Sequence, residues 1–148
     1  DPRSEAVYAV DGRCSGFYAL AAQYLDPGST PPCIPDDTTL GLNNNRFKVQ
    51  VTWRDEYGRT GSGKVVPGAS DDSGIFWFFS DANWELLVKV LDGCGYNNRY
   101  WVFSSATTDQ EFTLTVTDTQ SEAQATNTNP LKNPADSVTD TDAFATCP

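Results

Sequence analysis

The sequence contains no histidine, no methionine and few basic residues. Without histidine, the commonest general base near neutral pH and the commonest nitrogen ligand for metals are both missing. This absence argues against a zinc hydrolase, a Ser-His-Asp enzyme and a Cys-His protease. The 20 acidic and 10 basic side chains give a formal net charge of −10. Nucleic acids and anionic membranes bind clusters of Lys and Arg, so neither is expected as a partner.

Long apolar runs are also missing. No segment reaches the roughly 18 apolar residues that a membrane-spanning helix needs, so membrane insertion is not expected. Nothing at the start is typical of a signal peptide, and Asp1-Pro2-Arg3 is interpreted as a start left after processing. A chain of 148 residues is long enough to build one compact domain with an ordinary core.

Cysteines are few and widely spaced, at Cys14, Cys33, Cys94 and Cys147. This even number without a C-x-x-C pair favours two structural disulfides over a zinc site or a redox motif, with buried thiols as the alternative. Three pairings are possible. We favour Cys14–Cys33, a short local clip, and Cys94–Cys147, which would hold the C-terminal tail. A disulfide frame predicts a secreted protein, extracellular or on the cell surface.

Apolar residues recur at every second position from about residue 45 onward. Residues 47–53, 84–91 and 112–117 alternate in this way, and threonines occupy the outward positions of the last segment. In residues 84–91 the alternation places Trp84, Leu86, Val88 and Val90 on one face. Residues 75–79 are an aromatic run that we predict to be a strand buried on both faces, and residues 99–104 form a further strand.

Turn signals separate these segments roughly every 10 to 14 residues, a spacing typical of β-sandwiches. The fold prediction is all-β, an immunoglobulin-like antiparallel β-sandwich over residues 42–148. Residues 1–41 are predicted to be an N-terminal extension with a strand at 6–10, a short helix or loop at 17–25 and a proline-rich linker. Beyond residue 119 the chain is polar, and only residues 143–145 are expected to dock on the core.

Several motifs resemble an uncharacterised β-rich module that recurs in secreted and surface proteins of environmental bacteria. They are LNNNRF at 42–47, VTWR at 51–54, DSGIFWFF at 72–79, ELLVKVLDGC at 85–94, YWVF at 100–103, TLTVTDT at 113–119, NP at 129–130 and AFATCP at 143–148. Members often carry a Cys where this chain has Gly41, which implies a disulfide pattern rewired through Cys14. The resemblance implies an extracellular module and supplies no catalytic residue.

Aromatic residues offer one candidate binding surface. Trp84, Tyr96 and Trp101 are candidate ligand aromatics, because flat rings stack on the apolar faces of sugars. The alternative is that the large aromatic residues fill the core of the sandwich. The first interpretation predicts a carbohydrate-binding module with a polysaccharide as partner.

Acidic residues offer two weaker candidates. Asp36-Asp37, Asp71-Asp72 and Asp140-Thr141-Asp142 have oxygens that calcium accepts, but none has the spacing of a known calcium loop and Asp also favours turns. Glu85 or Asp109 with Glu111 is a conceivable glycosidase pair. We predict no metal site, no cofactor and no catalytic residue, and hence no enzyme.

The N-terminal extension suggests a role in assembly. Ala6, Val7, Tyr8, Ala9 and Val10 form a candidate strand that either pairs within its own domain or adds to the sheet edge of a neighbouring subunit. The leading function hypothesis is a non-enzymatic extracellular structural or interaction protein. Its expected partners are further copies of itself or other surface proteins, in an assembly such as a filament joined by strand addition.

Overall fold

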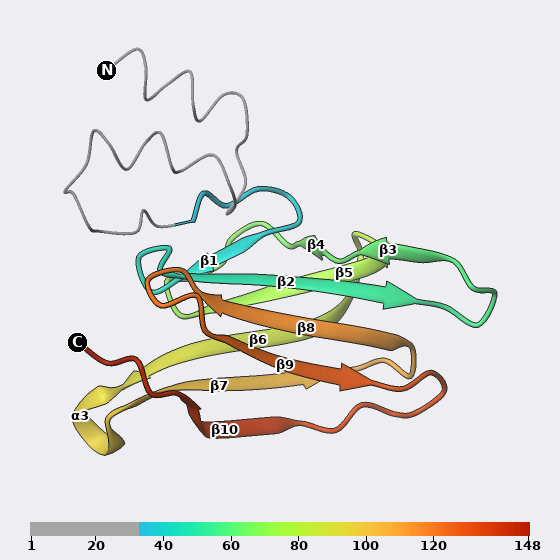
Figure 1. The fold of residues 1–148 in the computed structure, drawn as a ribbon. Helices are drawn as coiled ribbons and strands as arrows, with labels where there is room; N and C mark the ends of the chain where they lie inside the picture. Colours follow the sequence, from blue (N-terminus) through green and yellow to red (C-terminus); the bar gives the residue numbers. More distant parts are fainter. Residues whose placement is uncertain (1–32) are drawn as a thin grey trace, which may run out of the picture.

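A computed structural model describes residues 33–148, which form ten strands and one short helix (Figure 1). The elements are β1 (Leu40–Leu42), β2 (Phe47–Arg54), β3 (Thr60–Ser62), β4 (Lys64–Val65), β5 (Ser73–Ser80), β6 (Asn83–Gly93), α3 (Cys94–Asn97), β7 (Arg99–Ala106), β8 (Glu111–Asp118), β9 (Gln124–Asn129) and β10 (Val138–Phe144). No helix within this part of the chain is both long and apolar enough to cross a membrane.

The strands form two sheets of five. In the β2 sheet the order is β1-β2-β8-β9, with β3 also paired to β2, and in the β6 sheet it is β10-β7-β6-β5-β4. Every pairing is antiparallel. The chain crosses from β7 to the β2 sheet for β8 and β9, then returns to place β10 beside β7 (Figure 1). The antiparallel all-β prediction is confirmed.

One apolar core lies between the two sheets. Its fully buried side chains come from both sheets and include Phe47, Val49, Val51, Phe76, Leu86, Val88, Val90, Phe112, Leu114, Val116 and Phe144. The alternation predicted for residues 47–53 and 112–117 holds, since every second residue of β2 and β8 faces this core. Phe144 packs 5.2 Å from Phe47, ring centre to ring centre, so the predicted docking of residues 143–145 is confirmed at its central residue.

The prediction that residues 75–79 are buried on both faces is wrong. Within residues 75–79 only Phe76 and Phe78 are buried, while Ile75 and Trp77 lie half-buried on the opposite face and Phe79 is exposed. A run of apolar letters hides the strand's period of two, because both faces carry apolar side chains. The sandwich has only two layers in the described residues, so the outer face of β5 has no third layer over it.

The alternation predicted for residues 84–91 fails at its first position. Phe76 pairs with Leu86 but Trp77 pairs with Trp84, so β6 has one extra residue, Glu85, at this point. Such a bulge shifts the facing of the residues beyond it. Trp84 is therefore 53% exposed and Glu85 only 6% exposed, the reverse of the prediction.

The polar C-terminal region supplies two strands that were not predicted. β9 and β10 are edge strands of the two sheets. Edge strands with one wet face need few apolar residues, which explains why the Thr- and Asn-rich sequence QATNTN forms regular pairs with β8. β10 is interrupted by a bulge between Asp140 and Phe144.

One predicted disulfide lies within the described residues and is present. Cys94 in α3 bonds to Cys147, which ties the C-terminal tail to the end of β6. The other predicted pairing, Cys14–Cys33, involves a residue outside the described part of the chain. At this end of the sandwich Asn43, Asn44 and Asn45 all have positive φ, between 54° and 60°, a left-handed conformation that asparagine adopts more readily than most residues.

A buried ion pair holds the same end together. The Arg46 guanidinium donates from Nε and Nη2 to the two carboxylate oxygens of Asp118, both at 2.9 Å, and from Nη2 to the backbone oxygen of Thr146 at 2.8 Å. Nη1 reaches the Tyr100 hydroxyl at 3.0 Å. Burial opposes the charge of Asp118, but the hydrogen bonds from Arg46 and its other neighbours outweigh it and lower the pKa of Asp118 to about 2.

Candidate functional site

The two outer faces of the sandwich differ in character. The outward side chains of three neighbouring strands of the β2 sheet are polar throughout: Lys48, Gln50, Thr52 and Arg54 on β2, Glu111, Thr113, Thr115 and Thr117 on β8, and Gln124, Thr126 and Thr128 on β9. Cross-strand threonine pairs and the Arg54–Glu111 ion pair run across it. This face is suited to water and offers no apolar contact.

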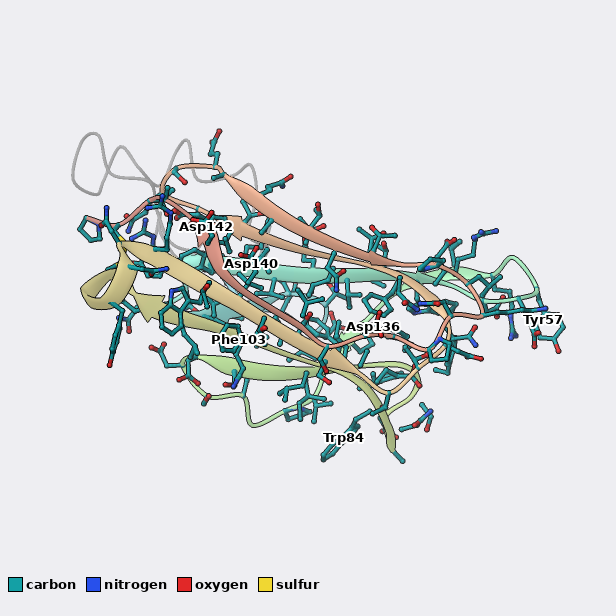
Figure 2. All side chains as sticks on the ribbon, turned by 90° about the horizontal axis from the view of Figure 1, so that it is seen from below. Tyr57, Trp84, Phe103, Asp136, Asp140 and Asp142 are labelled. Atoms are coloured by element: carbon teal, nitrogen blue, oxygen red, sulfur yellow. A yellow bond between two sulfur atoms is a disulfide. The ribbon has the colours of Figure 1, made fainter. Side chains whose placement is uncertain are left out.

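The outer face of the β6 sheet is largely apolar. Its outward side chains include Ile75 and Trp77 on β5, Trp84, Leu87 and Leu91 on β6, and Trp101 and Phe103 on β7. Ile75 lies opposite Leu87, and Leu91 lies opposite Trp101. Leu87 is 40% exposed, and Figure 2 shows Trp84 projecting away from the ribbon. We call this set of seven residues the apolar face.

Lys89 lies beside the apolar residues of this face. Its Nζ is 5.4 Å from the ring centre of Phe103, close enough for a cation–π contact. The rings of Phe103 and Trp101 are nearly parallel, at 13°, with centres 6.1 Å apart. Lys89 therefore covers part of the face with its stem while its ammonium stays near solvent.

The three predicted ligand aromatics fall into two groups. Tyr96 and Trp101 lie together, with ring centres 5.7 Å apart and planes tilted by 46°. Trp101 donates from Nε1 to Asn97 and lies directly over Gly93, where a Cβ atom would clash. Trp84 is at the opposite end of β6, seven residues before Leu91, which lies opposite Trp101; at 3.3 Å per residue the separation is roughly 20–23 Å. The structure does not join them into one platform.

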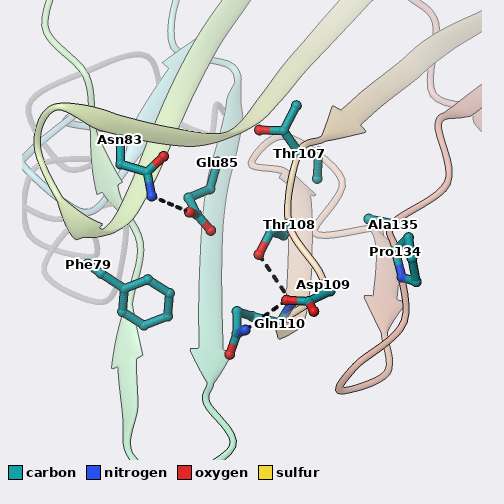
Figure 3. A pocket seen from close by; sticks show the side chains of 10 residues that line it. Phe79, Asn83, Glu85, Thr107, Thr108, Asp109, Gln110, Pro134 and Ala135 are labelled. Carbon is teal, nitrogen blue, oxygen red and sulfur yellow. Dashed lines mark hydrogen bonds between the residues drawn. The ribbon is translucent and has the colours of Figure 1, made fainter.

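A pocket of about 600 Å³ opens at the end of the sandwich where β6 begins (Figure 3). Three separate segments build it: the β5–β6 hairpin, the β7–β8 connection and the β9–β10 connection. Its lining residues are Phe79, Asn83, Glu85, Ala106, Thr107, Thr108, Asp109, Gln110, Pro134 and Ala135. Sequence reasoning did not identify this pocket, because no single segment carries its pattern.

Glu85 is the unusual residue of this pocket. Asn83 donates from Nδ2 to its Oε1 at 3.0 Å, while Oε2 is buried without a hydrogen-bond partner among the described residues. Burial raises the pKa of Glu85, the nearby Thr108 hydroxyl and the amide of Asn83 oppose the shift, and the charge of Asp109 raises the pKa further. The bulge in β6 is what turns this carboxyl inward.

The predicted glycosidase pair is only partly assembled. Glu85 and Asp109 line the same pocket, but Glu111 accepts two hydrogen bonds from Arg54 on the outer face of the β2 sheet. Glu111 is therefore engaged elsewhere and does not line this pocket.

The acidic pairs act as turn acceptors. Asp36 accepts from the backbone N–H of Thr38, Asp72 from the Ser73 hydroxyl, and Asp140 from the backbone N–H of Asp142; Asp71 instead accepts from the backbone N–H of Asn44 in another loop. Within residues 33–148 no group of three His, Cys, Asp or Glu side chains is placed to hold a metal ion. These contacts favour the turn interpretation of the acidic pairs over the calcium interpretation.

The predicted assembly strand, Ala6 to Val10, lies outside the described residues. Sequence analysis did not name Leu87 and Leu91 of the apolar face as candidate site residues. The alternation of residues 84–91 nevertheless predicted that both face outward. No sequence pattern predicted that Phe79 and Asn83 line a pocket.

No family model matches this chain, and comparison with curated proteins and with solved structures finds no match either.

Proposed function

We propose that this chain is a non-enzymatic contact protein that associates with further copies of itself through the apolar face. The observation that carries the proposal is the asymmetry between the two outer faces: one is polar at every outward position of its central strands, and the other is dominated by Ile, Leu, Trp and Phe. Contiguous exposed apolar surface of this kind marks interaction sites in proteins that are otherwise well packed.

The apolar face supplies about half of a standard protein interface. Its three strands, β5, β6 and β7, lie about 4.8 Å apart and are about eight residues long, so they cover roughly 400 Å², against the roughly 800 Å² per partner of a standard interface. Its composition also fits, since aromatic residues are enriched and charged residues depleted in interface centres. Lys89 is the charged residue among its outward positions on β6, and its stem lies against Phe103.

A second copy is the partner that the surface relief favours. Beside Ile75 and Leu87 the face has a shallow hollow of about 210 Å³, which Val66 and Pro67 also line. Leu87 is an exposed aliphatic knob next to this hollow. A two-fold axis would bring the knob of each copy to the hollow of the other, which is the self-complementary contact of symmetric dimers.

A flat sugar platform is less well supported on this face. Tyr96 and Trp101 are tilted by 46° to each other, and the centre of the face is aliphatic. Aliphatic side chains supply no hydrogen bonds to sugar hydroxyls, whereas they contribute fully to a protein contact.

The wider context of this function is also a proposal. The Cys94–Cys147 disulfide supports an extracellular location, because such bonds persist in oxidising compartments. Membership of the secreted module and the second disulfide stay predictions. The immunoglobulin-like arrangement also stays a prediction. Two packed antiparallel sheets support it, but the immunoglobulin fold does not require the β5-β6-β7 meander.

Strand addition through residues 6–10 is the second route to assembly that we propose. The edge best suited to accept such a strand is β9, whose pairing with β8 is regular over six residues and which carries no charge. The other long edge, β10, is blunted by its bulge and by Asp140 and Asp142 (Figure 2).

Sedimentation velocity over a concentration series tests both routes. The parent chain is compared with Leu87→Glu, with a chain lacking residues 1–13, and with Thr115→Glu as a matched charge on the polar face. The face model predicts that only Leu87→Glu abolishes association, and the strand model that only the truncation does. A parent chain that stays monomeric, or one that loses association equally in Thr115→Glu, would overturn self-association.

A further inference from the structure

We infer that the pocket lined by Phe79, Glu85 and Gln110 binds a neutral saccharide, independently of the apolar face. It lies at the end of the sandwich, whereas the apolar face covers the outside of one sheet. Its volume of about 600 Å³ is within the 300–1,000 Å³ typical of small-molecule sites. This is room for one or two sugar rings.

Glu85 supplies the strongest indication of a ligand. Glu85 is only 6% exposed, yet its Oε2 has no hydrogen-bond partner among the described residues. An unsatisfied buried acceptor is costly, and this one lines a pocket that a ligand can enter. Oε2 has almost no accessible surface, so the Glu85 carboxyl would turn toward the pocket for a ligand hydroxyl to donate to it.

The rest of the lining has the mixture of groups that sugars need. Phe79 is an exposed ring held edge-on by Trp53, with centres 4.7 Å apart, and its face suits the C–H side of a pyranose. Asn83 and Gln110 offer amide donors and acceptors, and Thr107 offers a hydroxyl (Figure 3). A small number of placed polar groups beside an apolar surface is how ligand sites combine affinity with orientation.

Charge decides which saccharides fit. The lining contains two carboxyl groups, Glu85 and Asp109, and no Lys or Arg. The whole chain carries a formal charge of −10. Uronic acids, sulfated sugars and phosphorylated glycans would be repelled, so the ligand class is neutral and rich in hydroxyl donors.

The test is an NMR titration of uniformly ¹⁵N-labelled chain with cellohexaose, xylohexaose and N-acetylchitohexaose, with hexagalacturonate as the anionic comparison. At about 10 mM, a site with a Kd near 1 mM is almost saturated. We expect one neutral probe to shift the amide signals of residues 79, 83–85 and 106–110, and hexagalacturonate to leave them in place.

Four variants locate the site. Glu85→Gln keeps the size of the side chain and should weaken binding about tenfold, the cost of losing a charged acceptor. Phe79→Leu keeps packing against Trp53 but removes the ring, and should weaken binding similarly. Trp84→Ala and Tyr96→Ala remove exposed rings outside the lining and should leave the affinity unchanged.

Three results would overturn the inference. The first is that no neutral probe shifts the pocket amides. The second is that Trp84→Ala or Tyr96→Ala abolishes binding while Phe79→Leu and Glu85→Gln retain it, which would place the ligand on the apolar face or beside Tyr96. The third is that hexagalacturonate binds as well as the neutral probes. Leu87→Glu should bind like the parent chain, so a failure of self-association does not affect this test.

Discussion

Replacing Asp118 by Asn should remove a large part of the stability of this fold. The Asp118 side chain is fully buried and its partner Arg46 is 11% exposed, so solvent screens their attraction weakly. A pKa lowered from 3.8 to about 2 corresponds to about 2.4 kcal/mol at 1.36 kcal/mol per pH unit. The variant also leaves a nearly buried guanidinium without its counter-charge, and breaking a buried pair costs about 3–5 kcal/mol. We therefore expect a loss of about 3 kcal/mol at pH 7.

The pH dependence gives the sharper test. The pKa of Asp118 is lower in the folded state than in the unfolded state, so its contribution is fully present above the unfolded pKa and is lost as the pH falls toward 2. Between about pH 5 and pH 2 the parent chain should lose about 2 kcal/mol through this group alone, and the full 2.4 kcal/mol only near pH 1. The Asp118→Asn variant has no carboxyl to titrate and should show a flatter profile over the same range.

Urea unfolding followed by tryptophan fluorescence at a series of pH values measures both effects. Glu111→Gln is the matched control, because Arg54 and Glu111 form the same two-point contact on the same sheet but their side chains are 49% and 33% exposed. Exposed pairs contribute little, so this variant should unfold like the parent. Equal losses in the two variants, or an unchanged slope in Asp118→Asn, would refute the reasoning that burial gives the pair its strength.

Three further predictions concern the same scaffold. Glu85→Gln should raise the melting temperature at pH 7 and above. Because the pKa of Glu85 is raised in the folded state, the parent chain loses stability as the pH rises through that pKa. Thermal unfolding at pH 4 should show no difference between the variant and the parent chain. Cys94→Ser, measured by urea unfolding, should cost roughly 4 kcal/mol through loss of a cross-link between residues 53 apart, and a reducing agent should have no further effect at this pair. Phe144→Ala should cost about 3–5 kcal/mol by opening a cavity beside Phe47, and hydrogen exchange should then accelerate first in β10.

The central strands were predictable because their residues alternate. Phe47 to Trp53 and Phe112 to Val116 have one apolar and one polar face, so the period of two is visible in the sequence alone. The apolar face erased this signal in residues 75–79, because both sides of β5 carry apolar side chains. A strand with an exposed apolar face and a doubly buried strand therefore look alike in sequence.

The pocket depends on features that local patterns do not encode. One extra residue in β6 exchanges the positions of Trp84 and Glu85, and nothing in the sequence around them marks a bulge. The other walls come from connections more than twenty residues away, which only the pairing of the sheets brings together. The C-terminal strands were missed for a related reason, since an edge strand such as β9 needs partners more than it needs apolar residues.

The strand order has a consequence for how this protein acquires its structure. β5, β6 and β7 are neighbours in both sequence and sheet, so this meander closes through short hairpins. β2 must instead wait for β8, since the Arg46–Asp118 pair that fixes their register joins residues 72 apart. Such distant contacts give sandwiches folding times of milliseconds to seconds rather than microseconds. During synthesis the meander can therefore form first. Its inner face then stays uncovered until β2 and β8 pack on it, while its outer face already exposes apolar residues to chaperones or to other copies.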